Sequence, residues 1–418
     1  MKFLHASDIH LDSPLRGLRA RAGEKADEIA TAPRAAFVKL IEFAIDQKVD
    51  LLLLAGDNWD GGHTDYGSLL FFMGQMSRLG RAGIRAVMIQ GNHDAENQLK
   101  IKGTDNLTIL SSHKPKTVKF EDLGVAIHGQ SYPQRDVQEN LAANYPAPIA
   151  GLINIGLLHT AVAGYSGTHH SYAPCSVQDL RDRGYDYWAL GHIHARTQIS
   201  DNPWIIYPGN LQARFLGEAG EKGATLVTIE DGRITEVAHV HLDVVRWMRI
   251  SVDVSSCDSQ DEIAVTLQRG LREAVNSVGG RTVAARIYLE GQTRMHQSLK
   301  LNASEWIAAE VERARLDIDN LWIEQIIIDT KQRPDSRANS DSGAIAEIEG
   351  AVAHILDNAQ EKLAFKTQIS EVASKLAPSL AEMIMRGPDD EPLDEDAVLE
   401  SVLSDAKDIL LARITGAA

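Results

Sequence analysis

Five short segments of this sequence carry residue types that bind divalent cations. They are Asp8-Ile9-His10, Gly56-Asp57-Asn58-Trp59-Asp60, Gly91-Asn92-His93-Asp94, His159 and Gly191-His192-Ile193-His194. Together they offer two carboxylates, an amide and four imidazoles to a pair of cations, and one further imidazole for proton transfer. This combination predicts metal-assisted chemistry on a phosphoester.

Asp57 is the candidate bridge between the two cations. A bridging carboxylate keeps two cations about 3.5–4 Å apart, which lets both hold one phosphate and activate one water. One site would be completed by Asp8, His10 and His194, and the other by Asn92, His159 and His192. Nitrogen and oxygen ligands without thiolate suit manganese, iron or zinc better than calcium or magnesium, which prefer oxygen alone.

His93 is the imidazole that this assignment leaves over. Placed beside the metals but not bound to them, it could protonate the leaving alkoxide. Asp60 and Asp94 follow closely in the same segments and have two interpretations. They either orient the histidines through hydrogen bonds or are loop carboxylates that face water.

Each of the five segments follows a short apolar run that has to position it. The runs cover residues 2–6, 51–55, 85–90, 153–158 and 185–190, and they have the composition of buried strands. Ligands of open α/β sheets bind at the carboxyl ends of strands, so residues spread over nearly 190 positions are expected in one cleft. Apolar residues between 37 and 45 at helical spacing predict a connecting helix, with Pro33 near its start. Asp231-Gly232 predicts a hairpin turn.

The chain of 418 residues exceeds the usual limit of a single core, so two or three domains are expected. We predict a first domain over residues 1–245. A strand, helix, strand, helix, strand pattern restarts over residues 246–330 and predicts a small α+β domain. Residues 331–343 are polar and aperiodic, as in a linker, and residues 344–418 predict helices with an apolar stripe.

Cysteine content and charge limit the class of protein. The only two cysteines, Cys175 and Cys257, exclude a disulfide framework and a Cys-rich zinc module, and they favour the cytoplasm. No apolar run approaches the roughly 20 residues that span a bilayer, so a soluble protein without membrane contact is expected. The net charge of −16 argues at first against nucleic acid, but residues 301–418 contribute −13 and leave −3 for residues 1–300.

The five segments resemble the motifs of the calcineurin-like metallophosphoesterases. The flanking residues 5–15, 185–192 and 207–210 are similar to the bacterial DNA-repair exonucleases of the SbcD group, especially the YhaO-like branch. The resemblance covers residues 1 to about 245. It implies an α/β fold with a calcineurin-like two-sheet core flanked by helices, a small α+β capping domain and a helical C-terminal segment.

The resemblance also implies a function, which is a Mn²⁺-dependent DNA exo- or endonuclease subunit in DNA repair. Its C-terminal segment would dock on an SMC-like ATPase, and a homodimer is left open. The ligand roles of the family fall on the seven positions assigned above, and its catalytic histidine falls on His93. Archaeal and eukaryotic relatives often carry a histidine where this sequence has Asp60, so the role of that histidine is not transferred.

Two other functions remain open at this stage. The metal motifs by themselves specify only phosphoester chemistry, so the chain could be a small-molecule or phosphoprotein phosphoesterase. A capping domain and a helical tail favour the nuclease, whereas the near-neutral charge of residues 1–300 is evidence against it. An interaction subunit with a vestigial nuclease is disfavoured by the complete set of ligands.

Further residues could touch substrate or simply be solvated. Arg16, Arg19 and Arg21 follow the first metal segment and could meet the DNA backbone. His169 and His170 lie together in a polar loop.

His239 and His241 share one face of an expected strand. We interpret them as surface residues, because no third metal-binding partner lies near them in the sequence.

Overall fold

The computed structural model describes residues 1–13, 25–61, 66–96, 102–165, 170–333, 342–376, 385 and 393–414. The chain forms two compact units. Of the described residues, the first unit contains those up to Val245 except 215–219, and the second contains 215–219 and those from Arg246 onward. Within the described ranges, no helix has both the length and the apolar character needed to cross a membrane.

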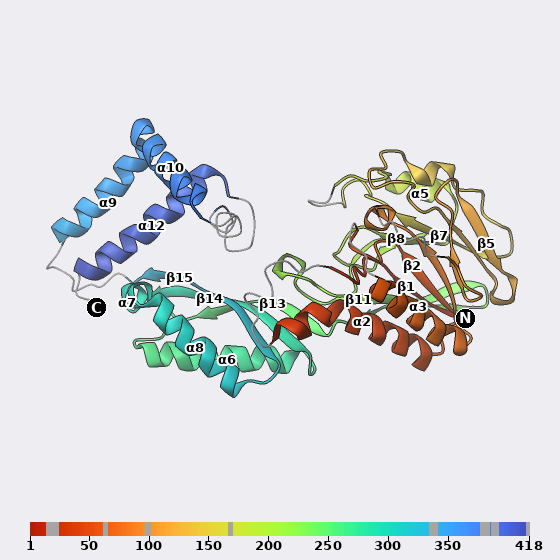
Figure 1. Cartoon of the computed structure of the whole chain (residues 1–418), viewed down its shortest axis with the longest axis horizontal. Helices are drawn as coiled ribbons and strands as arrows, with labels where there is room; N and C mark the ends of the chain where they lie inside the picture. Colours follow the sequence, from red (N-terminus) through yellow and green to blue (C-terminus); the bar gives the residue numbers. More distant parts are fainter. Residues whose placement is uncertain are drawn as a thin grey trace. The chain divides into compact units, whose positions relative to one another are not determined.

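Two six-stranded sheets form the first unit (Figure 1). The first sheet has the order β12-β11-β1-β2-β3-β4, with β1 (Lys2–Ala6), β2 (Leu51–Ala55), β3 (Arg85–Ile89), β4 (Leu107–Ile109), β11 (Gly223–Glu230) and β12 (Arg233–His241). The second has the order β5-β6-β7-β8-β10-β9, with β5 (Lys116–Phe120), β6 (Val125–Gly129), β7 (Ile153–His159), β8 (Tyr187–Gly191), β9 (Thr197–Asp201) and β10 (Trp204–Tyr207). Strands β1 to β4 run parallel, and so do β6, β7, β8 and β10.

The two sheets pack face to face through an apolar layer. Phe3, Leu53 and Val87 of the first sheet belong to one cluster with Ile155 and Leu157 of the second. Alternate residues of a strand point to opposite faces, so each strand that is buried on both sides supplies two apolar layers.

His5 is a polar residue within this apolar layer. Its Nε2 lies 2.9 Å from the carbonyl oxygen of Leu190, and its Nδ1 lies 3.1 Å from the hydroxyl of Tyr187. A carbonyl oxygen only accepts, so Nε2 carries the hydrogen and Nδ1 accepts from the Tyr187 hydroxyl. A fully buried imidazole on β1 is thus bound to β8 of the opposite sheet.

Helices cover the outer faces of both sheets. Figure 1 shows α2 (Ala26–Asp46) and α3 (Tyr66–Arg81) alongside the sheet that contains β1 and β2, and their residues Phe37, Leu40 and Phe72 share a core with that sheet. The second sheet is covered by loops and by α5 (Val177–Asp182). Contrary to expectation, Pro33 lies inside α2, because the buried positions Ile29 and Ala32 extend the apolar face upstream.

The second unit begins with a three-stranded sheet of β13 (Val245–Asp253), β14 (Thr282–Thr293) and β15 (Leu321–Gln332). The helices α6 (Gln260–Ser277), α7 (His296–Leu301) and α8 (Ala303–Asp317) share one apolar core with this sheet. All five elements expected between residues 246 and 330 are therefore present, with α7 in addition.

Three helices follow, namely α9 (Ser342–Asp357), α10 (Ala359–Ser374) and α12 (Glu395–Ile414). The side chain of Asn358 accepts hydrogen bonds from the backbone of Gln360 and Glu361 at 3.0 and 3.2 Å, which starts α10 as a separate helix. Ion pairs join α12 to α7, with Lys300 at 2.9 Å from Asp405. The predicted α/β fold with two sheets, flanking helices, an α+β unit and a helical C-terminal segment is confirmed.

Candidate metal centre

Parallel strands bring the five metal-binding segments together. Three segments follow the carboxyl ends of the neighbouring strands β1, β2 and β3, and the other two lie at the ends of β7 and β8. The sheets meet here directly, because Nδ1 of His159 lies 2.9 Å from the carbonyl oxygen of Ala55 at the end of β2. The strand-end rule used on the sequence therefore places the segments correctly relative to one another.

The loops after β1 and β2 are held in a strained shape by hydrogen bonds between them. The amides of Asp8 and Ile9 donate to the carbonyls of Gly56 and Asp57 at 3.0 and 2.8 Å. Asp8, His10 and Asp57 have φ values of 51°, 49° and 51°, and His192 has a φ of 105°. Such left-handed conformations cost a residue other than glycine about 1–3 kcal/mol and concentrate at functional sites. Four of the seven candidate ligands are strained in this way.

One group of candidate ligands consists of Asp8, His10 and His194, whose ligand atoms lie within 4.8 Å of one another. The Nε2 atoms of His10 and His194 are 3.4 Å apart, and Nε2 of His194 is 3.8 Å from the Asp8 carboxylate. Donors around one cation that is bound at about 2.1 Å lie roughly 3.0–3.5 Å apart. The spacing of these atoms therefore suits a shared cation.

The second group consists of Asp8, Asp57 and His159, again within 4.8 Å. Nε2 of His159 lies 3.4 Å from Oδ2 of Asp57 and 3.0 Å from Oδ1 of Asn92. The Ala55 carbonyl holds a hydrogen on Nδ1 of the same ring, which leaves Nε2 as the nitrogen that can bind a metal. Asp8 belongs to both groups.

The buried carboxylates of the second group favour a positive charge beside them. Burial alone would raise the pKa of the Asp57 carboxyl, but the neighbouring His159 imidazole lowers it below its ordinary value. Burial would likewise lower the pKa of His159, but Asp57 and Asp8 raise it to about 9. The two buried carboxylates thus favour a positive charge beside them. Divalent cations would supply that charge, so the residues present fit a metal centre.

His192 belongs to neither three-residue group but lies beside them. Its ring centroid is 5.2 Å from that of His159, and its backbone N–H donates to the Asp8 carboxylate at 3.1 Å. Its Nε2 lies 2.8 Å from the carbonyl oxygen of His170, so Nδ1 is the nitrogen that could bind a cation. Burial lowers the pKa of His192 to about 4, which keeps the ring neutral, as a ligand has to be.

His93 lies next to the buried groups and is more exposed than they are. About 30% of its side chain is accessible, whereas Asp57 and His159 are almost completely buried. The backbone N–H of His93 donates to Oδ1 of Asp57 at 2.9 Å, and its ring centroid lies 5.2 Å from that of His10. The side chain can therefore meet a substrate without being buried among the candidate ligands.

Asp60 and Arg214 form a charged pair behind the histidines. Oδ1 of Asp60 lies 3.0 Å from Nδ1 of His10, 3.5 Å from Nδ1 of His93 and 3.4 Å from Nη1 of Arg214. Nη2 of Arg214 lies 3.3 Å from Nδ1 of His194. Burial would raise the pKa of Asp60, but the contact with His10 and the nearby Arg214 lower it to about 2. Asp60 is therefore a carboxylate that orients two histidines, the first of its two interpretations.

Asp94 has a different task from Asp60. It is buried and accepts hydrogen bonds from the backbone of Asn58, Trp59 and Gly91 at 2.9, 3.0 and 3.0 Å. It therefore fixes the backbone of the loop that carries Asp57.

Arg214 was not expected from the sequence, and only its position shortly after residues 207–210 could have drawn attention to it.

The remaining sequence features give a mixed outcome. Arg16, Arg19, Arg21 and His169 lie outside the described residues. His170 contributes its backbone carbonyl to the contact with His192. His239 and His241 gain a neighbour, Glu221, which the sequence did not reveal.

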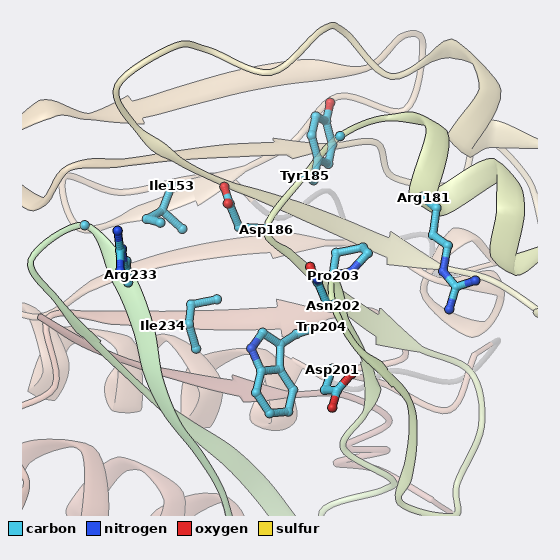
Figure 2. Close-up of a pocket in the computed structure, with 12 residues that line it drawn as sticks. Ile153, Arg181, Tyr185, Asp186, Asp201, Asn202, Pro203, Trp204, Arg233 and Ile234 are labelled. Carbon is cyan, nitrogen blue, oxygen red and sulfur yellow. The ribbon is translucent and has the colours of Figure 1, made fainter.

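A pocket in the first unit lies away from the metal-binding segments. Figure 2 shows Tyr185, Asp186 and Trp204 in its wall, together with Arg181 and Arg233. Tyr185 and Asp186 precede β8, so the pocket lies at the amino ends of the strands whose carboxyl ends carry His159 and His192. It therefore contributes nothing to the candidate metal centre.

Comparison with known proteins gives matches over both units. Residues 1–196 match the calcineurin-like phosphoesterase family, and residues 247–331 match the middle domain of the metallophosphoesterase YhaO. The chain is 34% identical to the uncharacterised metallophosphoesterase YhaO of Bacillus subtilis over 324 residues, which cover 76% of each protein. It is 26% identical to the DNA double-strand break repair protein Mre11 of Methanopyrus kandleri, over 65% of this chain and 63% of that protein. The Mre11 of Sulfolobus acidocaldarius is 21% identical over 77% and 83%.

Proposed function

Because the chain belongs to the calcineurin-like phosphoesterases, in the YhaO-like branch, we propose that it is a two-metal phosphodiesterase that cleaves DNA. Two of the proteins that it resembles, over 65% and 77% of its length, are DNA double-strand break repair proteins. The observation that carries the catalytic part is the pair of largely buried ligand groups at the strand ends, with the more exposed His93 beside them.

Calcineurin-like phosphoesterases use a dinuclear divalent metal site, and seven residues would hold the two cations here. Asp57 would bridge them, with Asp8, His10 and His194 on one side and Asn92, His159 and His192 on the other. When bound, two such cations supply Lewis acidity to a phosphoryl group and lower the pKa of a water molecule. We propose Mn²⁺ as the metal, from the mixed nitrogen and oxygen donors and the likeness to DNA-repair exonucleases.

The residues around the metals divide the remaining work. His93 would hold a proton at its Nε2 and give it to the departing alkoxide. Asp60 would fix the direction of the ring, since its Oδ1 lies 3.5 Å from the other ring nitrogen, Nδ1. Arg214 would balance the charge of Asp60, from which its Nη1 lies 3.4 Å.

The rest of the chain would adapt this centre to DNA. We propose residues 1–245 as the nuclease domain, 246–330 as a capping domain, 331–343 as a linker and 344–418 as a segment that docks on an SMC-like ATPase. The protein would then act as an exo- or endonuclease subunit in DNA repair. A cytoplasmic location fits its two free cysteines.

The test compares cleavage of DNA with cleavage of a generic ester. Full-length protein with Mn²⁺ is incubated with end-labelled duplex, hairpin and single-stranded DNA and, separately, with bis(p-nitrophenyl) phosphate. We expect cleavage into DNA fragments in the presence of Mn²⁺ and no cleavage when a chelator is added at the start. Hydrolysis of the small ester without any cut DNA would reject the nuclease, and the chain would then be a small-molecule or phosphoprotein phosphoesterase.

A further inference from the structure

A separate cluster of metal-binding side chains, away from the candidate metal centre, lies at the end of strand β12 in the first unit. His239 and His241 are two residues apart on this strand, so they point to the same face, and their ring centroids are 4.7 Å apart. Strand β11 runs antiparallel to β12 with Gly223 opposite His241. Because Glu221 lies just before β11, this pairing brings it next to His241. Its Oε2 lies 3.3 Å from Nδ1 of His241.

The three side chains can converge on one cation. One ligand atom from each lies within 4.8 Å of the other two. Around a tetrahedral zinc ion with bonds of about 2.1 Å, neighbouring ligand atoms are roughly 3.4 Å apart, so small side-chain rotations would close the group. Such rotations are available, because 60% of the Glu221 side chain and 36% of the His241 side chain are accessible.

A surface ion pair alone gives no account of this arrangement. Contacts between exposed charges contribute little to stability, and an ion pair by itself needs only one of the two imidazoles. Two imidazoles and one carboxylate are, by contrast, a donor set that zinc-binding proteins use with one position left for water.

We propose that Glu221, His239 and His241 form a third metal site, which binds a zinc-type divalent cation. It shares no residue with the candidate two-metal centre and does not depend on the proposed nuclease function. A bound cation would link Glu221, which precedes β11, to His239 and His241 on β12. Lys222, the residue after Glu221, donates from Nζ to the carbonyl oxygen of His194 at 2.7 Å, so the link would also support the loop that carries His194.

The test counts zinc ions in the full-length protein. After equilibrium dialysis against Zn²⁺, elemental analysis should give three ions per chain for the unchanged protein. His239→Gln and His241→Gln should each give two, and Glu221→Gln should bind the third ion more weakly. The matched control is His113→Gln, which changes an exposed histidine elsewhere and should keep three.

Thermal unfolding supplies an independent measurement. A ligand that binds only the folded chain raises the melting temperature, so Zn²⁺ should stabilise the unchanged protein more than either histidine variant. Circular dichroism checks that the variants are folded. Equal zinc counts in the unchanged protein and both histidine variants would overturn the proposal.

Discussion

Individual imidazoles of the candidate metal centre each have one nitrogen occupied by a neighbour. Nδ1 of His159 donates to the Ala55 carbonyl, Nε2 of His192 faces the His170 carbonyl, and Nδ1 of His10 lies 3.0 Å from Asp60. In each case the other ring nitrogen is the one that can bind a metal. Second partners of this kind orient a ligand before the metal arrives and raise its affinity.

His93 differs from these residues in its exposure, and its role can be tested through the leaving group. We expect His93→Ala to lower kcat for DNA about 10²–10⁴-fold, because an alkoxide needs a proton to leave. The loss should be much smaller for bis(p-nitrophenyl) phosphate, because nitrophenolate leaves without one. Steady-state kinetics on both substrates measure the difference, and elemental analysis should still find both metals.

The exposed His113 is the control for this experiment, and His113→Ala should leave both rates unchanged. An equal loss on the two substrates would contradict a proton-donating role for His93.

At the scale of elements, the loops after β2 and β3 can approach each other closely only because Gly91 has no side chain. A Cβ atom at Gly91 would collide with Oδ1 of Asp57 and would lie only 2.8 Å from Cε1 of His159. Both neighbours are candidate ligands, and both are almost completely buried. Neither can move without disturbing the centre.

We therefore expect Gly91→Ala to displace the Asp57 carboxylate and to lower cleavage roughly 100-fold, since small misplacements near a reacting centre have effects of this size. Elemental analysis should find fewer than two cations per chain. Gly74→Ala is the control, because nothing lies within 4 Å of a Cβ atom there and alanine is favoured inside a helix. Full activity and two bound metals in Gly91→Ala would show that the loops can separate without harm.

His5 joins the two sheets, and it makes their packing sensitive to acid. Burial lowers the pKa of His5 from 6.5 to about 3, so the unfolded chain takes up the proton first as the pH falls. The stability that neutral His5 contributes is thus fully present above pH 6.5 and is lost as the pH falls toward the folded pKa.

When the pH is lowered from about 7.5 to about 5, the free energy of unfolding should fall in both proteins. We expect the unchanged protein to lose about 2 kcal/mol more than His5→Gln. Glutamine keeps a donor for the Leu190 carbonyl but does not titrate in this range. Urea unfolding with a chelator present measures the difference, and the chelator removes any contribution from bound metal. Identical losses in the two proteins would mean that His5 does not carry this sensitivity.

At the scale of the whole molecule, the negative charge is concentrated in the C-terminal part of the chain. Residues 301–418 carry −13 of the net charge of −16, a poor surface for DNA but an adequate one for a protein partner. Helix α12 packs on α7 through Lys300 and His296, yet its residues Val402 and Ile409 remain 43% and 40% exposed. These two positions are seven residues apart and therefore lie on one face.

We expect the double variant Val402→Asp and Ile409→Asp to keep its intrinsic phosphodiesterase activity but to lose the proposed association with an SMC-like ATPase, because charge in an apolar interface is costly to bury. Co-purification with the ATPase of the same organism measures the association. Leu70→Asp, which changes an exposed apolar residue of α3, should still co-purify. Undiminished association of the double variant would place the docking surface elsewhere.

Much of the architecture was predictable because strands such as β2 and β7 consist mainly of apolar residues that follow one another in the sequence. Their ends were predicted within one or two residues. The Asp231-Gly232 turn has φ values of 49° and 70°, as its hairpin needs. Helix α3 and the edge strand β5 were not expected, since partly exposed elements leave a weaker apolar pattern. The break between α9 and α10 depends on one capping residue, Asn358.

The sequence by itself determined the type and order of the candidate ligands, because each of them directly follows or ends a strand. Only the tertiary structure decided which groups meet across strands and sheets. Examples are Asp60 with His10 and His93, Arg214 with His194, and Glu221 with His241. The pair of Asp60 and Arg214, for example, spans 154 positions of the chain. Local periodicity carries no information about such pairs, because they depend on strand register and on the packing of one sheet against the other.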